Sequence, residues 1–99
     1  MAQSTLAAIQ EISHKAIEDA IFSLLYSRSL SASICPSEAA KALVGRDGDW
    51  RLLMQLVRKV GRAMLKQKQL RVTQGDNELN AEQEWKGAIR FRLPNQLDP

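Results

Sequence analysis

The chain has 99 residues, 44% of them apolar, which is enough for one modest hydrophobic core but not for a deep substrate cavity. No stretch reaches the roughly 20 apolar residues that cross a bilayer. The net charge of +3 is uneven, because residues 1–45 carry three basic against four acidic residues, and residues 46–99 carry eleven against seven. The basic excess in the second half suggests an anionic partner, most simply nucleic acid, although a solvated cationic face is the commoner explanation.

The compartment follows from the cysteine count and the N-terminus. Cys35 is the single cysteine, so an internal disulfide is excluded. Residues 1–10 lack the basic cluster and apolar core of a signal peptide. We therefore expect a soluble, unprocessed, cytoplasmic protein with one domain over residues 1–99, a core at about 13–93 and a frayed tail at 94–99.

The first predicted helix covers about Ser13 to Arg28, and its pattern extends back toward Thr5. Apolar residues recur there at three- and four-residue steps (Ile9, Ile12, Ile17, Ile21, Leu24 and Leu25). A serine-rich connection, residues 27–33, follows the helix and leads into a short extended piece at residues 33–34.

A second, short helix is predicted from Pro36 to Val44. Proline suits the first helical position because its missing N–H needs no partner there, and Glu38 lies in the first turn, where the helix dipole favours a carboxylate. Gly45 supplies the stop. A turn then leads to Asp49, the predicted N-cap of the next helix, so the two helices form a helix-turn-helix unit.

The third predicted helix, Trp50 to about Gln69, carries six of the fourteen Lys and Arg residues. Residues 50–73 contain seven Lys or Arg and no Asp or Glu. At about 100° per residue, one arc of roughly 80° collects five polar residues: Arg51, Gln55, Arg58, Arg62 and Lys66. The apolar residues lie opposite: Leu53, Leu56, Val57, Val60 and Met64. Such a helix buries one face and offers the other to a polyanion.

Two segments alternate like half-buried strands, residues 70–73 and 88–93. In the second strand, Arg90 and Arg92 are expected to face water or a ligand. The segment between the strands reads as one long hairpin loop. The element order predicts a mainly α, α+β fold: a winged helix-turn-helix with three helices and a two-stranded β-hairpin wing.

Several segments together resemble a small bacterial family of uncharacterised, winged-helix-like domains. They are Ser33-Ile34-Cys35-Pro36-Ser37-Glu38, Trp50-Arg51 with Leu53-Met54 and Val57-Arg58, Val72-Thr73-Gln74-Gly75, and Lys86-Gly87 with Ile89-Arg90. The resemblance covers roughly residues 15–93 and implies a fold, but no activity, ligand or catalytic residue.

The first functional hypothesis is a DNA-binding protein that places the basic helix in the major groove. A transcriptional regulator would be one protein of this kind. Arg51, Gln55 and Arg58 would then read base edges, because arginine and glutamine form bidentate bonds with guanine and adenine. Arg62 and Lys66 would contact phosphate, and the strands would add further phosphate contacts through Arg71, Arg90 and Arg92. The predicted test is Arg58→Glu, which should weaken duplex binding without unfolding the domain.

The competing hypothesis is a winged-helix adaptor that binds a protein and no nucleic acid. The predicted wing holds four acidic residues against Lys86 alone: Asp76, Glu78, Glu82 and Glu84. These carboxylates would repel a DNA backbone and suit a partner of mixed charge. A homodimer through the N-terminal helix fits either hypothesis, and neither requires a membrane.

The remaining candidates each have a structural explanation. A helix N-terminus favours a reactive thiolate at Cys35, and the alternative is a small buried cap residue. Trp50 and Trp85 either anchor helix and wing or stack on bases. No nucleophile, base and orienting group come together in the sequence, so we expect no enzyme, metal or cofactor.

Overall fold

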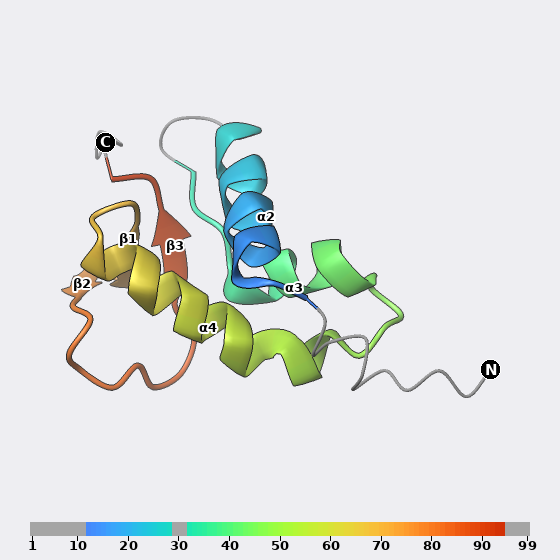
Figure 1. Ribbon diagram of the computed structural model, residues 1–99. Helices are drawn as coiled ribbons and strands as arrows, with labels where there is room; N and C mark the ends of the chain where they lie inside the picture. The colour runs from blue at the N-terminus through green and yellow to red at the C-terminus, as the bar shows by residue number, and fades with distance from the viewer. Residues whose placement is uncertain (1–11, 29–31, 95–99) are drawn as a thin grey trace.

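The computed structural model describes residues 12–28 and 32–94 and consists of three helices followed by a small antiparallel sheet (Figure 1). The elements are α2 (His14–Tyr26), α3 (Pro36–Val44), α4 (Trp50–Lys66), β1 (Arg71–Gln74), β2 (Asn77–Leu79) and β3 (Arg90–Arg92). The predicted mainly α, α+β class is confirmed. The expected helical extension toward Thr5 and most of the C-terminal tail lie outside the described residues.

Helix α2 forms where the apolar spacing predicted it, with its buried face made of Ile17, Ile21 and Leu25. The side chain of Ser13 caps the helix by accepting a 3.0 Å hydrogen bond from the backbone N–H of Ala16. The helix ends at Tyr26, two residues before the predicted boundary.

Helix α3 begins at Pro36 and ends at Val44, as predicted. At its start, the backbone N–H of Cys35 donates a 2.8 Å hydrogen bond to Glu38 Oε2, so the glutamate satisfies a donor that the helix itself leaves unpaired. At its end, Gly45 adopts φ 87° and donates its N–H to the carbonyl of Lys41 at 2.7 Å.

Helix α4 packs through its apolar face against α2, α3 and the sheet. That face is fully buried at Leu53, Val57, Val60, Gly61 and Met64. Gly61 lets the sheet approach closely, because a Cβ atom there would lie 2.5 Å from Cζ of Phe91. The buried phenylalanine therefore sits directly against the helix backbone.

The ends of α4 differ from the prediction in detail. Asp49 occupies the N-cap position, but its side chain makes no capping hydrogen bond, and the helix ends at Lys66 rather than near Gln69. The carbonyl of Asp49 accepts a 3.0 Å bond from the N–H of Leu52, which closes the first turn without the side chain.

The sheet has three strands in the order β2-β1-β3, so the predicted two-stranded wing is wrong. The expected pairing of the two predicted strands is present, with Val72 opposite Phe91. The additional strand β2 pairs with the other edge of β1 through a tight turn, in which Gly75 has φ 60°. A left-handed glycine at the first central position is what a type II′ hairpin turn requires.

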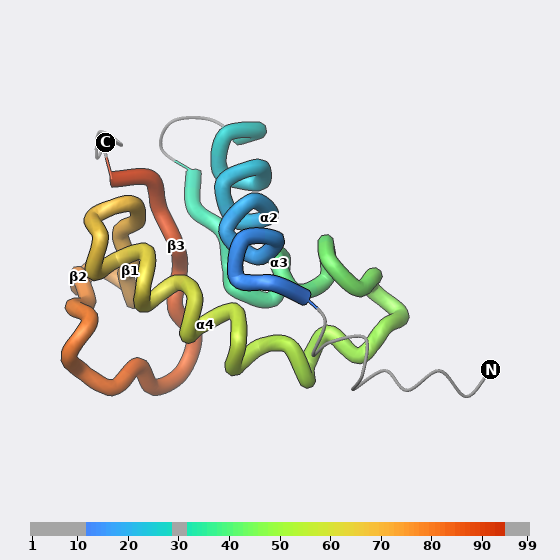
Figure 2. The backbone as a smooth tube through the Cα atoms, in the orientation of Figure 1, coloured from blue at the N-terminus to red at the C-terminus, as the bar shows by residue number. Residues whose placement is uncertain are grey.

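The segment between α2 and α3 joins the sheet through one residue. Ile34 and Phe91 exchange backbone hydrogen bonds of 3.0 and 2.8 Å, which confirms the extended piece expected at residues 33–34. Figure 2 shows this connection running beside β3. Helices and sheet thus share one core around Phe91 and Ile34.

Candidate nucleic-acid interface

The outward face of α4 divides into an exposed part and a half-buried part. Arg51, Gln55 and Lys66 are exposed, as is Lys59, which sequence reasoning did not include. Arg58 and Arg62 are half-buried. Lys59 lies about 40° from Gln55 on the helix, just outside the predicted arc, so a wider arc would have included it.

Arg58 and Arg62 hold the loop between β2 and β3, residues 80–89, here called the β2–β3 loop. Arg58 donates to the carbonyls of Trp85, at 3.0 Å, and of Gly87, at 2.7 Å. Arg62 donates to the carbonyl of Ala81 and, at 2.9 Å, to that of Gln83. The two guanidinium groups therefore hold the backbone of the β2–β3 loop against α4. The side chain of Arg58 points toward this loop and not outward.

Trp85 anchors the same loop. Its ring is 6% exposed, its Nε1–H donates to the carbonyl of Asn80 at 2.9 Å, and the guanidinium carbon of Arg62 lies 4.1 Å from the ring centroid. Gln74 adds a further tie from β1 through its Nε2, which donates to the carbonyls of Lys86 and Ala88. The loop is thus held from both the helix and the sheet.

Trp50 is half-buried at the start of α4 and packs against the core. Two cations lie over its ring: Lys41 Nζ at 4.4 Å and the guanidinium carbon of Arg51 at 4.3 Å from the centroid. The ring is therefore covered by cationic side chains of its own domain, an arrangement that suits an anchor rather than a base-stacking platform.

The strand arginines lie apart from the α4 face and bind neighbouring elements. Arg71 forms an ion pair with Glu78 across the β1–β2 hairpin, with Nε 2.7 Å from Oε2. Arg92 donates to Thr73 Oγ1 at 3.2 Å. Arg90 donates to the hydroxyl and carbonyl of Ser33 at 2.9 and 3.0 Å. Phe91 faces α4, so the flanking Arg90 and Arg92 lie on the other face of the sheet.

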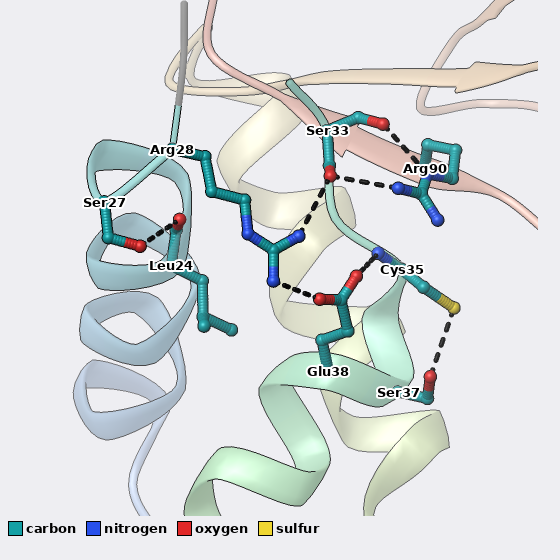
Figure 3. Close-up of polar contacts among 8 residues, drawn as sticks. All are labelled: Leu24, Ser27, Arg28, Ser33, Cys35, Ser37, Glu38 and Arg90. Atoms are coloured by element: carbon teal, nitrogen blue, oxygen red, sulfur yellow. Dashed lines mark hydrogen bonds and ion pairs between the residues drawn. The ribbon is translucent and has the colours of Figure 1, made fainter.

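Ser33 also belongs to a polar junction that sequence reasoning missed (Figure 3). Arg28, just after α2, forms an ion pair with Glu38 and donates to the carbonyl of Ser33 at 3.3 Å. Partial burial raises the pKa of Glu38, but the hydrogen bonds from Arg28 and from the Cys35 N–H outweigh it, so the pKa lies below its usual value. The junction ties α2, α3 and β3 together.

Cys35 lies at the edge of this junction and is half-buried. Its Sγ atom accepts a 3.2 Å hydrogen bond from the hydroxyl of Ser37 (Figure 3). The position matches the interpretation of Cys35 as a small cap residue. His14 is exposed on α2, with Nε2 3.0 Å from Glu18 Oε2.

The cations of α4 form no ion pair within the described residues. Within residues 12–28 and 32–94, the ion pairs are His14–Glu18, Lys15–Asp19, Arg28–Glu38 and Arg71–Glu78. None includes a cation of α4 or of its C-terminal turn: Arg51, Arg58, Lys59, Arg62, Lys66 and Lys68. Arg58 and Arg62 are hydrogen-bonded only to neutral carbonyls, so their charge is uncompensated although their geometry is fixed.

Two shallow grooves separate α4 from the β2–β3 loop. The first, of about 370 Å³, is lined by Gln55, Arg58, Lys59, Arg62, Glu84 and Trp85. The second, of about 480 Å³, lies toward the end of the helix and is lined by Leu65, Lys66, Lys68, Leu79, Asn80, Ala81 and Glu82. Each groove therefore has cations on the helix side and one carboxylate on the loop side.

The structure defines the protein as a small α+β domain that presents a cationic helix beside a fixed loop. The chain belongs to a family of proteins of unknown function, DUF3253, whose model matches residues 14–94. This match supports the resemblance to an uncharacterised domain. No curated protein matches the chain.

No helix of the described segments is long and apolar enough to span a membrane. The same segments contain no group of three or more His, Cys, Asp or Glu side chains placed to hold a metal ion.

Proposed function

We propose that the protein binds nucleic acid, most specifically duplex DNA, through the exposed face of α4, with the helices and sheet acting as a winged helix. The observation that carries the proposal is the set of six cations on one helix and its C-terminal turn, none of them in an ion pair within the described residues. A cationic ridge without carboxylate partners retains its full charge for phosphate groups and for the release of their counterions.

The geometry changes the roles expected for individual residues. Arg51 and Gln55 keep their proposed place as base readers, and exposed Lys59 joins them in place of Arg58. Lys66 and Lys68 are exposed at the end of the helix and are assigned to phosphate. Arg58 and Arg62 contribute charge while they position the β2–β3 loop.

The test is a titration of labelled duplex at low and moderate salt with the wild-type chain and two variants. Contacts with about four phosphates should give a log–log salt slope near −3.6. Lys59→Glu should weaken binding by about tenfold or more, since it reverses a charge in the middle of the ridge. Lys15→Glu is the matched control, because Lys15 lies on α2 and is already paired with Asp19 at 2.7 Å.

Arg58→Glu is no longer a clean test of DNA binding. Its loss removes two hydrogen bonds to the β2–β3 loop, so weaker binding would follow from loop disorder as well as from a lost contact. Lys59 makes no such bond within the described part of the chain, and therefore its substitution separates binding from folding.

The adaptor is the second candidate, and the two grooves favour it. Carboxylates of Glu82 and Glu84 stand opposite the helix cations, so the surface offers both signs of charge to a protein partner. An adaptor should show no saturable duplex binding even at low salt, and equal binding by wild type and Lys59→Glu would also reject the helix-in-groove proposal.

A further inference from the structure

The β2–β3 loop carries two exposed carboxylates along the cationic helix. Glu84 lines the groove that contains Arg58, Lys59 and Arg62, and Glu82 lines the groove that contains Lys66 and Lys68. Neither carboxylate forms an ion pair within the described residues. They therefore stand near the cations without neutralising any of them through direct contact.

The loop that carries these carboxylates is fixed in place. Its backbone receives four hydrogen bonds from Arg58 and Arg62 and two from Gln74, and Trp85 is buried beneath Arg62. A carboxylate on a mobile loop would move away from an approaching phosphate. Glu82 and Glu84 can change rotamer, but their backbone stays beside the helix.

We infer that Glu82 and Glu84 act as an electrostatic guard, which repels phosphate from the loop side of α4 and confines a polyanion to its outer side. This inference rests on the proposed function. Lys59 and Lys66 line the grooves together with Glu84 and Glu82, so a phosphate that enters a groove meets a loop carboxylate, whereas Arg51 lines neither groove. At 0.1 M salt the Debye length is about 10 Å, so repulsion across a groove is only partly screened.

The guard has two functional consequences. It lowers affinity for every nucleic acid, because like charges are brought together on binding. It also sets the side of the helix along which the phosphate backbone runs, and so selects one docking orientation. The arginines that fix the loop are thus positioning residues for specificity, besides contributing charge of their own.

The experiment compares two double variants in the same duplex titration. Glu82→Gln together with Glu84→Gln should bind about fivefold more tightly than wild type at low salt, and the gain should shrink as salt is raised. Asp19→Asn together with Asp76→Asn is the matched control, since it removes the same charge from exposed positions outside both grooves. The control should stay within about twofold of wild type.

A third variant tests position rather than charge alone. Glu84→Lys should make the salt slope steeper by about 0.9, because it opens the guarded groove to one more phosphate. An unchanged slope would show that no phosphate reaches this groove even when it is cationic, which overturns the orientation set by the guard.

The outcomes separate the two proposals. If the glutamine variant binds no better than the control while Lys59→Glu loses affinity, the guard is wrong and DNA binding stands. If neither wild type nor the glutamine variant binds duplex, both proposals are overturned. Binding by the glutamine variant alone would support the guard in its strongest form, as an inhibitor of the wild-type surface.

Discussion

Arginine fastens this domain together at two places, and the partners differ. At the junction of α2, α3 and β3, Arg28 pairs with the carboxylate of Glu38. At the β2–β3 loop, Arg58 and Arg62 donate to backbone carbonyls and form no ion pair within residues 12–28 and 32–94. Both arrangements join elements that are distant in the chain, but within the described residues only the second leaves the positive charge without a carboxylate partner.

The difference shows that a structural arginine can also belong to a binding surface. A carboxylate partner neutralises the guanidinium, so the pair presents little net charge to a distant phosphate. A carbonyl partner supplies a dipole but no net charge, and the cation stays visible in the surrounding field. Hydrogen bonding by itself therefore does not remove Arg58 and Arg62 from the candidate interface.

The largest effect should come from the carbonyl-bound side. Arg62→Ala should lower the free energy of unfolding by about 2–3 kcal/mol, because it removes charge-assisted hydrogen bonds and the cation over Trp85. Urea denaturation followed by circular dichroism measures this loss. Lys59→Ala on the same helix should stay within about 0.5 kcal/mol of wild type. Equal stability of the two variants would mean that Arg62 does not hold the loop.

A smaller effect is expected at the carboxylate-bound junction. Glu38→Ala removes the acceptor for the Cys35 N–H at the start of α3 and should cost about 1–2 kcal/mol, the usual value of a helix cap. Duplex affinity should remain within about twofold of wild type, since the ion pair carries little net charge. A large change in affinity at full folding would place this junction in the interface.

The same junction predicts a weak dependence of stability on acid. Because the folded pKa of Glu38 is below its ordinary value of 4.5, the ionised carboxylate stabilises the fold above about pH 4.5. That stabilisation is lost as the pH falls through the folded pKa. Glu38→Gln should therefore flatten the decline of melting temperature below pH 4.5, as measured by thermal unfolding. A decline identical to that of wild type would contradict the shift.

The smallest effect should follow from removing a neutral pair. Arg71→Gln combined with Glu78→Gln deletes a partly exposed hairpin ion pair and should change stability by less than about 1 kcal/mol and duplex affinity by less than twofold. Lys66→Gln removes an exposed helix cation and should weaken binding by about threefold, with a salt slope shallower by about 0.9. Reversed magnitudes would show that the sheet, and not α4, is the contact surface.

Local patterns were enough to predict the helices. Pro36 and Gly45 set the ends of α3, and apolar spacing gave α2 and α4 with small boundary errors. Strand β2 was missed because it has three residues, of which Leu79 alone is buried. Gly75 marked its turn, but one turn residue does not reveal that a strand follows.

The candidate site could be predicted only in part, because its decisive contacts join residues far apart in the chain. Helical geometry placed Arg58 and Arg62 on the polar face of α4. Their carbonyl partners lie 19 to 29 positions later, in a loop with no regular pattern. The acidic residues of the predicted wing also took different places, since Glu78 pairs with Arg71 while Glu82 and Glu84 face the grooves.

Gly61 determines how the cationic ridge is oriented relative to the rest of the domain. Phe91 occupies the space that a side chain would need, so the helix has one rotational setting at which its bare backbone meets the ring. A methyl group at this position would turn or lift α4, and because the ridge is part of the same rigid rod, every outward side chain would be redirected together. A single missing carbon atom in the interior thus sets the direction of a surface on a different face of the same helix.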